Sequence, residues 1–368
     1  MANNIYRVPT IYSDIKKTTE PLSVQVPGSK SITNRSLLLA MLAEGKSTLR
    51  GVLFSDDSRH FLKCVQDLGF ETTVDEESCI VTVEGLGGKL PCEEAVLNVG
   101  SAGTAARFLT ATLGVSEGVF HMDSSEQMKR RPMDPLLSSL AELGCEVRCE
   151  GEDGHFPFTL TAHGFGQDHI SIDIGHSSQF LSALLIASTL SSEDFTIQVE
   201  GTHGMAYIEM TQKMMEQFGV CVERPTPDQF RIPAGQHYKA LDYQIEPDVS
   251  AACYFYAMVP LLGIPVCVEH VHFESLQGDV EFLRILEKWD VPHRIRKRES
   301  SCCLLQLYRT PERRLPLSMV SRWTCPPVPI RRSHWQPSHR LPTAPPVSQA
   351  SGTSVSRRVT ASMPSVQN

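Results

Sequence analysis

The sequence predicts an α/β fold of two domains, assembled from repeated β-α-β-α-β-β units. Three glycines, Gly69, Gly144 and Gly219, recur at one constant interval along the chain, and each one ends an amphipathic helical segment. One helix that ends in glycine would mean little, but three at one spacing indicate a repeated unit. The length of 368 residues exceeds what one ordinary core accommodates and suits two domains.

The helices that end at these glycines share one pattern. Their apolar residues have the spacing of a helix that is buried on one face. The glycine then acts as a left-handed C-terminal cap that turns the chain into the next strand. A fourth copy reaches Asp290, a similar interval beyond Gly219, at the position where the repeat requires glycine. We expect these four helices within residues 57–69, 133–144, 208–219 and 279–290.

Each unit also carries a second, more apolar helix. These helices are expected at residues 31–43, 103–113, 178–190 and 250–262. Short segments rich in β-branched and aromatic residues follow, and they predict strands at residues 80–83, 158–161 and 197–199.

The composition changes abruptly after Lys288. Residues 1–288 contain 21 basic and 39 acidic side chains, a net charge of −18, whereas residues 289–368 contain 13 basic and three acidic ones, a net charge of +10. The last segment also holds 11 of the 24 prolines and shows no sustained period of 2 or 3.6. One interpretation is a basic, proline-rich disordered tail. The break at Asp290 favours another, a reading frame shifted at Lys288, which the gene sequence around codons 285–295 would test.

These observations predict a complete domain of three units at residues 29–245 and an incomplete unit after it. Residues 289–368 form an aberrant, disordered tail rich in proline and arginine.

Composition narrows the class of protein. No segment approaches the ~20 apolar residues of a membrane span, and the N-terminus lacks the apolar region of a secretory signal. The eleven cysteines include no Cys-x-x-Cys pair, so the sequence predicts no metal site and a reducing, cytoplasmic location. The acidity of residues 1–288 argues against nucleic acid as a partner. An anion would be bound by a few basic side chains aimed into one cleft.

The segment Pro27-Gly28-Ser29-Lys30-Ser31 carries the first anion-binding pattern. A glycine turn leads into a helix whose first free amides point outward, which suits an anion. Lys30 and Ser31 add a charge and a hydroxyl at that end. Arg35 lies one turn later on the same face, so its guanidinium can close on the same ligand. The alternative is a capped helix with a solvated lysine, but Arg35 interrupts an apolar helix, and a buried arginine needs a partner.

Two further segments are weaker signals on their own. Small residues around Gly103, just before a helix, let a ligand approach the backbone closely. Arg107 holds in this unit the place that Arg35 holds in the first. The run Met128-Lys129-Arg130-Arg131-Pro132 is either a solvated loop or a clamp for carboxylate or phosphate.

The last such segment places Ser177, Ser178 and Gln179 at a helix start, where an ordinary N-cap is the alternative, and His176 is expected on the surface. Gly45-Lys46-Ser47-Thr48 is superficially similar to a phosphate-binding loop. That loop requires glycine at position 40, which is Ala40, and here the tetrapeptide follows a helix. We therefore reject a nucleotide site.

Taken in order, these segments resemble the 5-enolpyruvylshikimate-3-phosphate synthase family. The run Pro-Gly-Ser-Lys-Ser-x-x-x-Arg at residues 27–35 is highly specific. The resemblance covers residues ~20–288 and implies a two-domain inside-out barrel of six β-α-β-α-β-β units that closes on substrate at the crossing. In that fold one domain is split, so residues 1–28 together with 246–288 would form an incomplete domain, and the second copy of the split domain would be unfinished. The other motifs that carry it lie at residues 55–57, 102–105, 128–132, 177–181, 207–211, 246–255 and 275–279.

The resemblance also implies a reaction. An enolpyruvyl group would pass from phosphoenolpyruvate to the 5-hydroxyl of shikimate 3-phosphate, with release of phosphate, on the route to chorismate and the aromatic amino acids. No metal or organic cofactor would be needed, and we expect a monomer. By matching position, shikimate 3-phosphate would be held by Lys30, Ser31, Arg35, Ser177, Ser178 and Gln179. Phosphoenolpyruvate would be held by Lys30, Gly103, Arg131 and Gln179.

Departures from the family pattern leave alternatives open. Ser101 replaces an Asn of the family, and Gly204-Met205-Ala206-Tyr207 replaces Ser-Lys-Pro-Tyr, so one hydroxyl is missing. The acid/base residues that the family carries later in the chain have no counterpart, so no catalytic residue is assigned. One alternative is an inactive fragment that retains shikimate 3-phosphate binding. The other is UDP-N-acetylglucosamine enolpyruvyl transferase, which lacks the pattern at residues 27–35.

Overall fold

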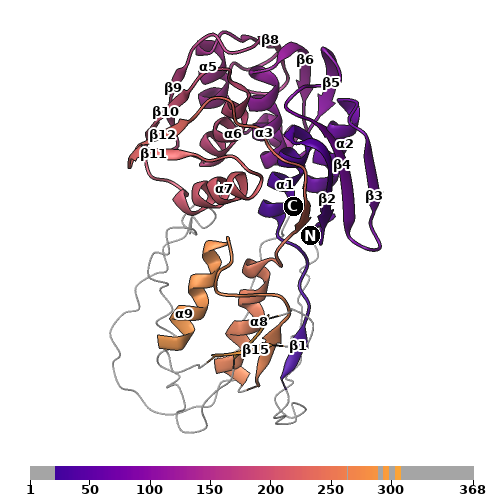
Figure 1. Ribbon diagram of the computed structural model, residues 1–368, viewed down its shortest axis with the longest axis vertical. Helices are drawn as coiled ribbons and strands as arrows, with labels where there is room; N and C mark the ends of the chain where they lie inside the picture. The colour runs from indigo at the N-terminus through magenta and orange to yellow at the C-terminus, as the bar shows by residue number, and fades with distance from the viewer. Residues whose placement is uncertain (1–20, 263, 289–292, 298–302, 308–368) are drawn as a thin grey trace, which may run out of the picture.

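The computed structural model describes residues 21–262, 264–288, 293–297 and 303–307. They form two parts (Figure 1). The upper part comprises residues 29–245, and the lower part comprises the described residues before 29 and after 245. The predicted α/β fold of repeated units is confirmed, because all described strands belong to four small mixed sheets that helices accompany.

The four sheets share one topology. In each, two parallel strands are followed by two antiparallel ones, in the orders β13-β2-β4-β3, β5-β6-β8-β7, β9-β10-β12-β11 and β1-β14-β16-β15. The same connection therefore occurs four times, as the repeat in the sequence predicts.

The strand bounds in the upper part are β2 Glu44–Arg50, β3 Thr72–Asp75, β4 Ile80–Leu86, β5 Glu94–Asn98, β6 Glu117–Asp123, β7 Glu146–Cys149, β8 Phe158–His163, β9 His169–Asp173, β10 Phe195–Glu200, β11 Glu223–Thr226, β12 Gln229–Ile232 and β13 Asp242–Gln244. Those in the lower part are β1 Leu22–Val24, β14 Val266–Val268, β15 His293–Lys297 and β16 Cys303–Leu307.

Two chain segments cross between the parts and exchange strands. Strand β13, late in the chain, pairs with β2 of the first upper sheet, while β1, near the beginning, pairs with β14 of the lower sheet. Where the segments pass, Gly28 pairs with Pro247 in an antiparallel bridge. Ser29 N donates to Glu246 O at 2.8 Å, and Asp248 N donates to Pro27 O at 2.8 Å.

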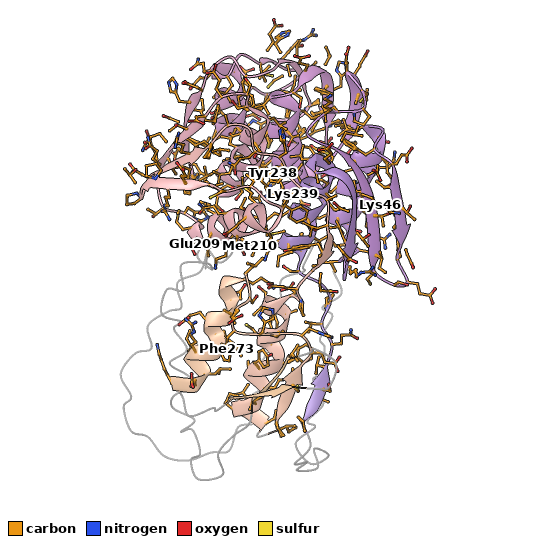
Figure 2. The ribbon with its side chains drawn as sticks, in the orientation of Figure 1. Lys46, Glu209, Met210, Tyr238, Lys239 and Phe273 are labelled. Atoms are coloured by element: carbon orange, nitrogen blue, oxygen red, sulfur yellow. The ribbon has the colours of Figure 1, made fainter. Side chains whose placement is uncertain are left out.

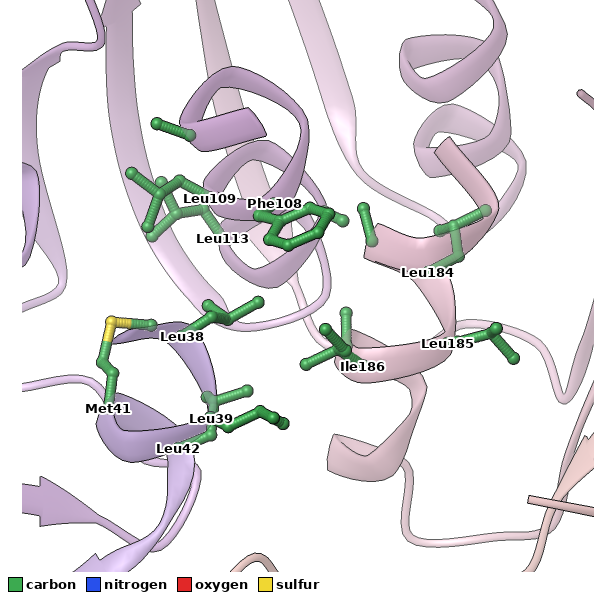
Figure 3. Packing of buried hydrophobic residues seen from close by; sticks show 14 of the residues in the cluster. Leu38, Leu39, Met41, Leu42, Phe108, Leu109, Leu113, Leu184, Leu185 and Ile186 are labelled. Atoms are coloured by element: carbon green, nitrogen blue, oxygen red, sulfur yellow. The ribbon is translucent and has the colours of Figure 1, made fainter. Parts of the chain in front are cut away.

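Three inner helices form the centre of the upper part: α1 Lys30–Leu42, α3 Gly103–Gly114 and α6 Gln179–Ala187, the last continued by the 3-10 turn η1 Ser188–Leu190. They match the predicted apolar helices. Leu38 of α1, Phe108 of α3 and Ile186 of α6 are fully buried, and their side chains lie in the space between the three helices (Figure 3). Because this face of each helix is apolar, their association removes a continuous surface from water.

The outer helices are α2 Asp56–Asp67, α5 Asp134–Glu142, α7 Met205–Gln217 and, in the lower part, α9 Glu281–Lys288, which the 3-10 turn η2 Gly278–Val280 precedes. The short helix α4 Glu126–Lys129 lies between β6 and α5. Gly69, Gly144 and Gly219 have φ values of +93°, +101° and +92°. The predicted left-handed caps are therefore confirmed at all three positions.

The lower part contains one unit, built from β1, α8 Val249–Leu262, β14, α9, β15 and β16. Its own core includes Val249, Tyr256, Val268 and Leu283. The sequence predicts a disordered tail from residue 289, and the structure differs at ten residues of it. Residues 293–297 and 303–307 pair with each other, and 303–307 also pair with β14. The other positions of the predicted tail lie outside the described residues.

Candidate functional site

The starts of the three inner helices lie together. Gln179 Nε2, at the start of α6, donates to Thr104 Oγ1 at the start of α3, at 3.4 Å. Arg35 Nη2, in the second turn of α1, donates to Ser182 Oγ of α6 at 3.4 Å. Segments that carry three of the predicted motifs are therefore neighbours, although they are far apart in sequence. Figure 2 shows Glu209 and Met210 of α7 at the edge of the upper part that faces the lower part.

Arg35 is buried and bonded to protein atoms. Its Nε donates to Thr211 Oγ1 at 2.8 Å, and its Nη groups donate to Ser31 O at 3.1 Å and Tyr207 O at 3.4 Å. The guanidinium also lies 5.3 Å from the ring centroid of Phe108. Burial lowers the pKa of Arg35 to about 10, so it remains a cation at neutral pH. The sequence predicts that Arg35 holds the ligand. In the structure Arg35 bonds the carbonyls of Ser31 and Tyr207, which line the cleft described below, and is not itself among the residues that line it.

Arg107 repeats this arrangement one unit later. Its Nη1 donates to Gly103 O at 3.1 Å, and its guanidinium lies 5.7 Å from the ring centroid of Phe180. Arg35 and Arg107 thus each bond a carbonyl one helical turn before them, and each faces a phenylalanine of the inner helix in the next unit. Burial, followed by the neighbouring charge of Arg131, lowers the pKa of Arg107 to about 9. Arg107 Nε has no hydrogen-bond partner among the described residues.

The guanidinium groups of Arg131 and Arg107 both lie close to Gly103. A Cβ at position 103 would lie 2.7 Å from Arg131 Nη1 and 3.1 Å from Arg107 Nη1, so a larger residue would displace the guanidinium groups. Within the described ranges, no carboxylate lies within ion-pair distance of Arg35, Arg107 or Arg131. Two neighbouring positive charges without a counterion are typical of a site that binds an anion.

Lys30 and Ser31 line a cleft between the two parts. The cleft has a cavity of about 190 Å³, and its upper wall also includes Tyr207 and Met210. Lys30 Nζ pairs with Asp57 at the start of α2. The lower wall is formed by Asp248, Ser250, Gln277, Gly278 and Asp279.

Buried polar groups fix the lower wall. Gln277, only 4% exposed, accepts from Val249 N at 3.1 Å and donates to Pro247 O at 2.7 Å. The Glu246 carboxylate accepts from Ser275 Oγ at 2.5 Å and from Leu276 N at 3.1 Å. Burial, with a smaller contribution from Asp279, raises the pKa of Asp248 above its ordinary value. These hydrogen bonds hold the crossing segment at residues 246–249 to the loop at residues 275–277, just before η2.

The predicted site residues divide into two groups. Lys30 and Ser31 line the cleft, whereas Gly103 and Arg131 lie at the start of α3 and just after α4. Gln179 joins α6 to α3, and its backbone N–H donates to Ser177 Oγ at 3.2 Å. Ser178 is buried against Gly204, where a Cβ would lie 2.4 Å from Ser178 Oγ. The serine that the family pattern has at position 204 would therefore not fit in this arrangement.

Sequence reasoning assigned no role to the lower wall or to Asp57. Asp57, Asp248, Gln277 and Asp279 belong to motifs that carry the family resemblance, but their chemistry was left unassigned. Because they lie within those motifs, the sequence did contain a signal by which they could have been assigned.

Among the described residues, no group of three or more His, Cys, Asp and Glu side chains could hold a metal ion. No helix in that part of the chain is long and apolar enough to cross a membrane.

These features define an α/β repeat protein in which Arg107 and Arg131 lie near the starts of the inner helices without a carboxylate partner among the described residues. A family model described as EPSP synthase (3-phosphoshikimate 1-carboxyvinyltransferase) matches residues 17–313. The chain belongs to this family.

Similar proteins agree with this assignment. A 3-phosphoshikimate 1-carboxyvinyltransferase of Trichormus variabilis is 43% identical over 267 residues, which are 72% of this chain and 63% of that protein. One of Photobacterium profundum is 39% identical over 278 residues, 73% of this chain and 65% of that protein. The chain thus spans less than two thirds of these relatives. The EPSP synthase structure from Acinetobacter baumannii is similar in fold, with a TM-score of 0.67 at 23% identity, over 78% of this chain and 64% of that one.

Proposed function

We propose that this chain takes part in the transfer of the enolpyruvyl group from phosphoenolpyruvate to the 5-hydroxyl of shikimate 3-phosphate, with release of phosphate. The observation that carries the proposal is the meeting of Arg107 and Arg131 over Gly103 without a carboxylate partner in the described ranges. Both substrates are phosphates that also carry a carboxylate, and planar guanidinium groups bind such anions in bidentate fashion.

The described residues divide between the two substrates. Lys30 and Ser31, whose carbonyl is held by Arg35, would bind shikimate 3-phosphate together with Ser177, Ser178 and Gln179. Arg131 above Gly103 would hold phosphoenolpyruvate, with Lys30 and Gln179 completing its site. Both substrates would thus lie where the starts of α1, α3 and α6 meet.

The chemistry requires charge stabilisation and proton transfer. The 5-hydroxyl loses its proton as its oxygen bonds to C2 of phosphoenolpyruvate, and C3 gains a proton. In the second half of the reaction C3 loses a proton, the bond between C2 and the phosphate oxygen breaks, and phosphate leaves. Fixed cations stabilise the anionic groups throughout. Proton transfer needs acid/base groups, and we assign none among the described residues.

The finer architecture belongs to the same proposal. The upper part would be the complete domain and the lower part the incomplete copy of a split domain, which together form a two-domain inside-out barrel that closes on substrate at the crossing. The paired crossing segments and the cleft between the parts support this. We further propose a monomer in the cytoplasm that uses no cofactor.

Calorimetric titration with shikimate 3-phosphate tests the binding half of the proposal. We expect binding to the wild-type chain, and a loss of about 10- to 150-fold in affinity in Lys30→Ala, which removes a charge-assisted contact. Arg131→Ala should leave this affinity unchanged and weaken the subsequent binding of phosphoenolpyruvate. Failure of the wild-type chain to bind shikimate 3-phosphate at millimolar concentration would refute the assignment.

A second candidate is a polypeptide that binds shikimate 3-phosphate without turnover. It is favoured by one observation, that the chain spans only 63% of the length of its Trichormus variabilis relative. Phosphate release in the presence of both substrates separates the candidates. Release that disappears in Arg131→Ala supports the transferase, and binding without release supports the second candidate.

A further inference from the structure

Thr211 is a buried residue of α7 whose hydroxyl contacts the Arg35 guanidinium. Its Oγ1 accepts from Arg35 Nε at 2.8 Å, and its single proton can go to Tyr207 O at 2.8 Å or to Ser182 Oγ at 3.0 Å. Thr211, Ser182 and Arg35 are at most 3% exposed, so these contacts lie away from bulk water. The hydroxyl therefore links a helix of the third unit to a cation of the first.

An ordinary structural role explains only part of this arrangement. A serine or threonine within a helix often donates to the carbonyl four residues earlier, as Thr211 does with Tyr207. Thr112 of α3 is equally buried and donates in the same way to Phe108 O at 3.0 Å. Its hydroxyl accepts no hydrogen bond from another described side chain. Thr211 is different because its oxygen accepts from a charged donor.

A comparison with Arg107 indicates that the repeat itself does not supply this contact. Arg35 and Arg107 each bond the carbonyl four residues before them, and each faces a phenylalanine ring. Arg107 Nε nevertheless has no partner among the described residues, whereas Arg35 Nε has Thr211. Because a guanidinium is a rigid planar fork, an acceptor at Nε fixes the plane and hence the direction of both Nη groups.

The orientation of Arg35 affects the cleft through two carbonyls. The Nη groups donate to Ser31 O at 3.1 Å and to Tyr207 O at 3.4 Å, and both residues line the cleft. Ser31 belongs to α1 and Tyr207 to α7, so Arg35 joins two helices of the upper wall. Rotation of the guanidinium would break both contacts and move the cation relative to the cleft.

We propose that Thr211, supported by Ser182, is a positioning residue that orients Arg35 and thereby arranges Ser31 and Tyr207 for the substrate. The identity of that substrate, shikimate 3-phosphate, rests on the proposed function, whereas the orientation of Arg35 rests on the contacts alone. Thr211 is not among the residues that line the cleft, so it acts through the arginine. A binding site keeps its affinity only when its contacting groups are themselves held in place.

Calorimetric titration of the full chain with shikimate 3-phosphate tests the proposal. Thr211→Val keeps the shape of the side chain but removes the acceptor for Nε, and we expect affinity to fall about 10-fold. Thr211→Ser restores the hydroxyl and should bind within about 2-fold of the wild type. Thr112→Val, the matched control, loses the same kind of bond to a helix carbonyl and should also stay within about 2-fold. In Arg35→Lys, which keeps the charge but lacks Nε, adding Thr211→Val should have no further effect.

A second measurement does not depend on the substrate. NMR of the isotope-labelled chain follows exchange of the Arg35 Nε–H proton with water, and the signal is assigned by its loss in Arg35→Lys. Exchange should be slow in the wild type and in Thr211→Ser, and about 10-fold faster in Thr211→Val, because the proton has lost its acceptor.

The outcomes separate this inference from the proposed function. Equal losses of affinity in Thr211→Val and Thr112→Val would overturn the positioning role, as would a Thr211→Ser variant that binds no better than Thr211→Val. If the wild-type chain does not bind shikimate 3-phosphate, the proposed function fails and the exchange of Nε–H decides the role of Thr211 by itself. Equal exchange in the wild type and Thr211→Val would then overturn it.

Discussion

Arg35 and Arg107 are buried cations in equivalent positions, but their hydrogen bonding differs. Arg35 donates to Thr211, Ser182, Ser31 O and Tyr207 O, so its guanidinium is satisfied by protein atoms. It adds a fixed positive charge beside Ser31, whose carbonyl it bonds. Arg107 donates from its Nη groups to Gly103 O and Pro132 O, but its Nε has no partner in the described part of the chain, and the charge of Arg131 lies nearby. An anion near Gly103 would relieve this repulsion, whereas Arg35 needs no ligand for its own stability.

The ion pair of Lys30 and Asp57 competes with any anion that enters the cleft. Because Lys30 is half exposed, the pair is worth only ~0.2–1 kcal/mol. In Asp57→Asn we expect inorganic phosphate to bind about 1.5- to 5-fold more tightly, measured by calorimetry at low ionic strength. Glu76→Gln, which breaks the exposed pair with Arg59, is the control and should change nothing. Weaker binding in Asp57→Asn would show that Asp57 itself contributes to the site.

Two buried thiols predict how stability depends on pH. Burial raises the pKa of Cys64 from 9.0 to about 12 and that of Cys145 from 9.0 to about 11. An unfolded chain loses these protons near pH 9 while the folded chain keeps them, so stability falls as pH rises from 9 towards 12. Urea unfolding between pH 7.5 and 10.5 should show this fall. Cys64→Ala should be less stable at pH 7.5 but depend less steeply on pH. Cys221→Ala, at an exposed position, should follow the wild type, and equal slopes in all three would contradict the prediction.

At the scale of elements, the crossing of the two chain segments depends on close backbone approach. A Cβ on Gly28 would lie 2.0 Å from Gly51 O, which cannot move without disturbing the end of β2. We expect Gly28→Ala to lower the free energy of unfolding by about 1–3 kcal/mol and to weaken the bridge to Pro247. Gly151→Ala has nothing within 4 Å of the added carbon and should remain within about 0.5 kcal/mol of the wild type. Thermal unfolding of both variants measures the difference, and equal stability would show that the segments can separate.

The elements were largely predictable because their signals are local. Gly69, Gly144 and Gly219 mark helix ends through backbone conformation, which the residue type alone indicates. The uncharged run of α8 and the apolar runs of α1, α3 and α6 likewise identify the inner helices. Strand β15 was missed because its composition is basic, and β16 because it is one short run in a segment without sustained periodicity. Pairing with β14 and with each other stabilises them against these local signals.

The site was predictable only in part, because its geometry depends on contacts distant in sequence. The chain showed that Lys30, Arg35 and Arg131 are cations near helix starts. It did not show that Arg35 would be hydrogen-bonded to Thr211, which belongs to a helix two units further on, or that the charges of Arg107 and Arg131 would lie close enough to interact. Hydrogen bonds between separate units follow from packing, which no single segment encodes.

At the scale of the whole molecule, the two parts have separate hydrophobic cores of very different size. The upper core extends from α1 through α3 and α6 to the sheets around them. Among the described residues, the lower core consists of eleven buried side chains, which include Tyr256 and Leu283. Among the described residues, the two parts contact each other at the cleft and along the two crossing segments, and Leu276 of the lower part packs on the upper core. Since stability scales with the apolar surface removed from water, the lower core should be much the weaker.

We therefore expect unfolding in two steps, the lower part first. Leu283→Ala, in the lower core, should shift only the first transition, and Leu140→Ala, in the upper core, only the second, each by about 2–5 kcal/mol. Both leucines are fully buried, so the substitutions are matched in chemistry and differ only in location. Urea unfolding followed by amide exchange at α8 and α3 separates the transitions. A single cooperative transition shifted by both variants would mean that the crossing segments and the cleft couple the two cores. In that case a ligand bound in the upper part would stabilise α8 as well, whereas with independent cores its binding would protect the upper part alone.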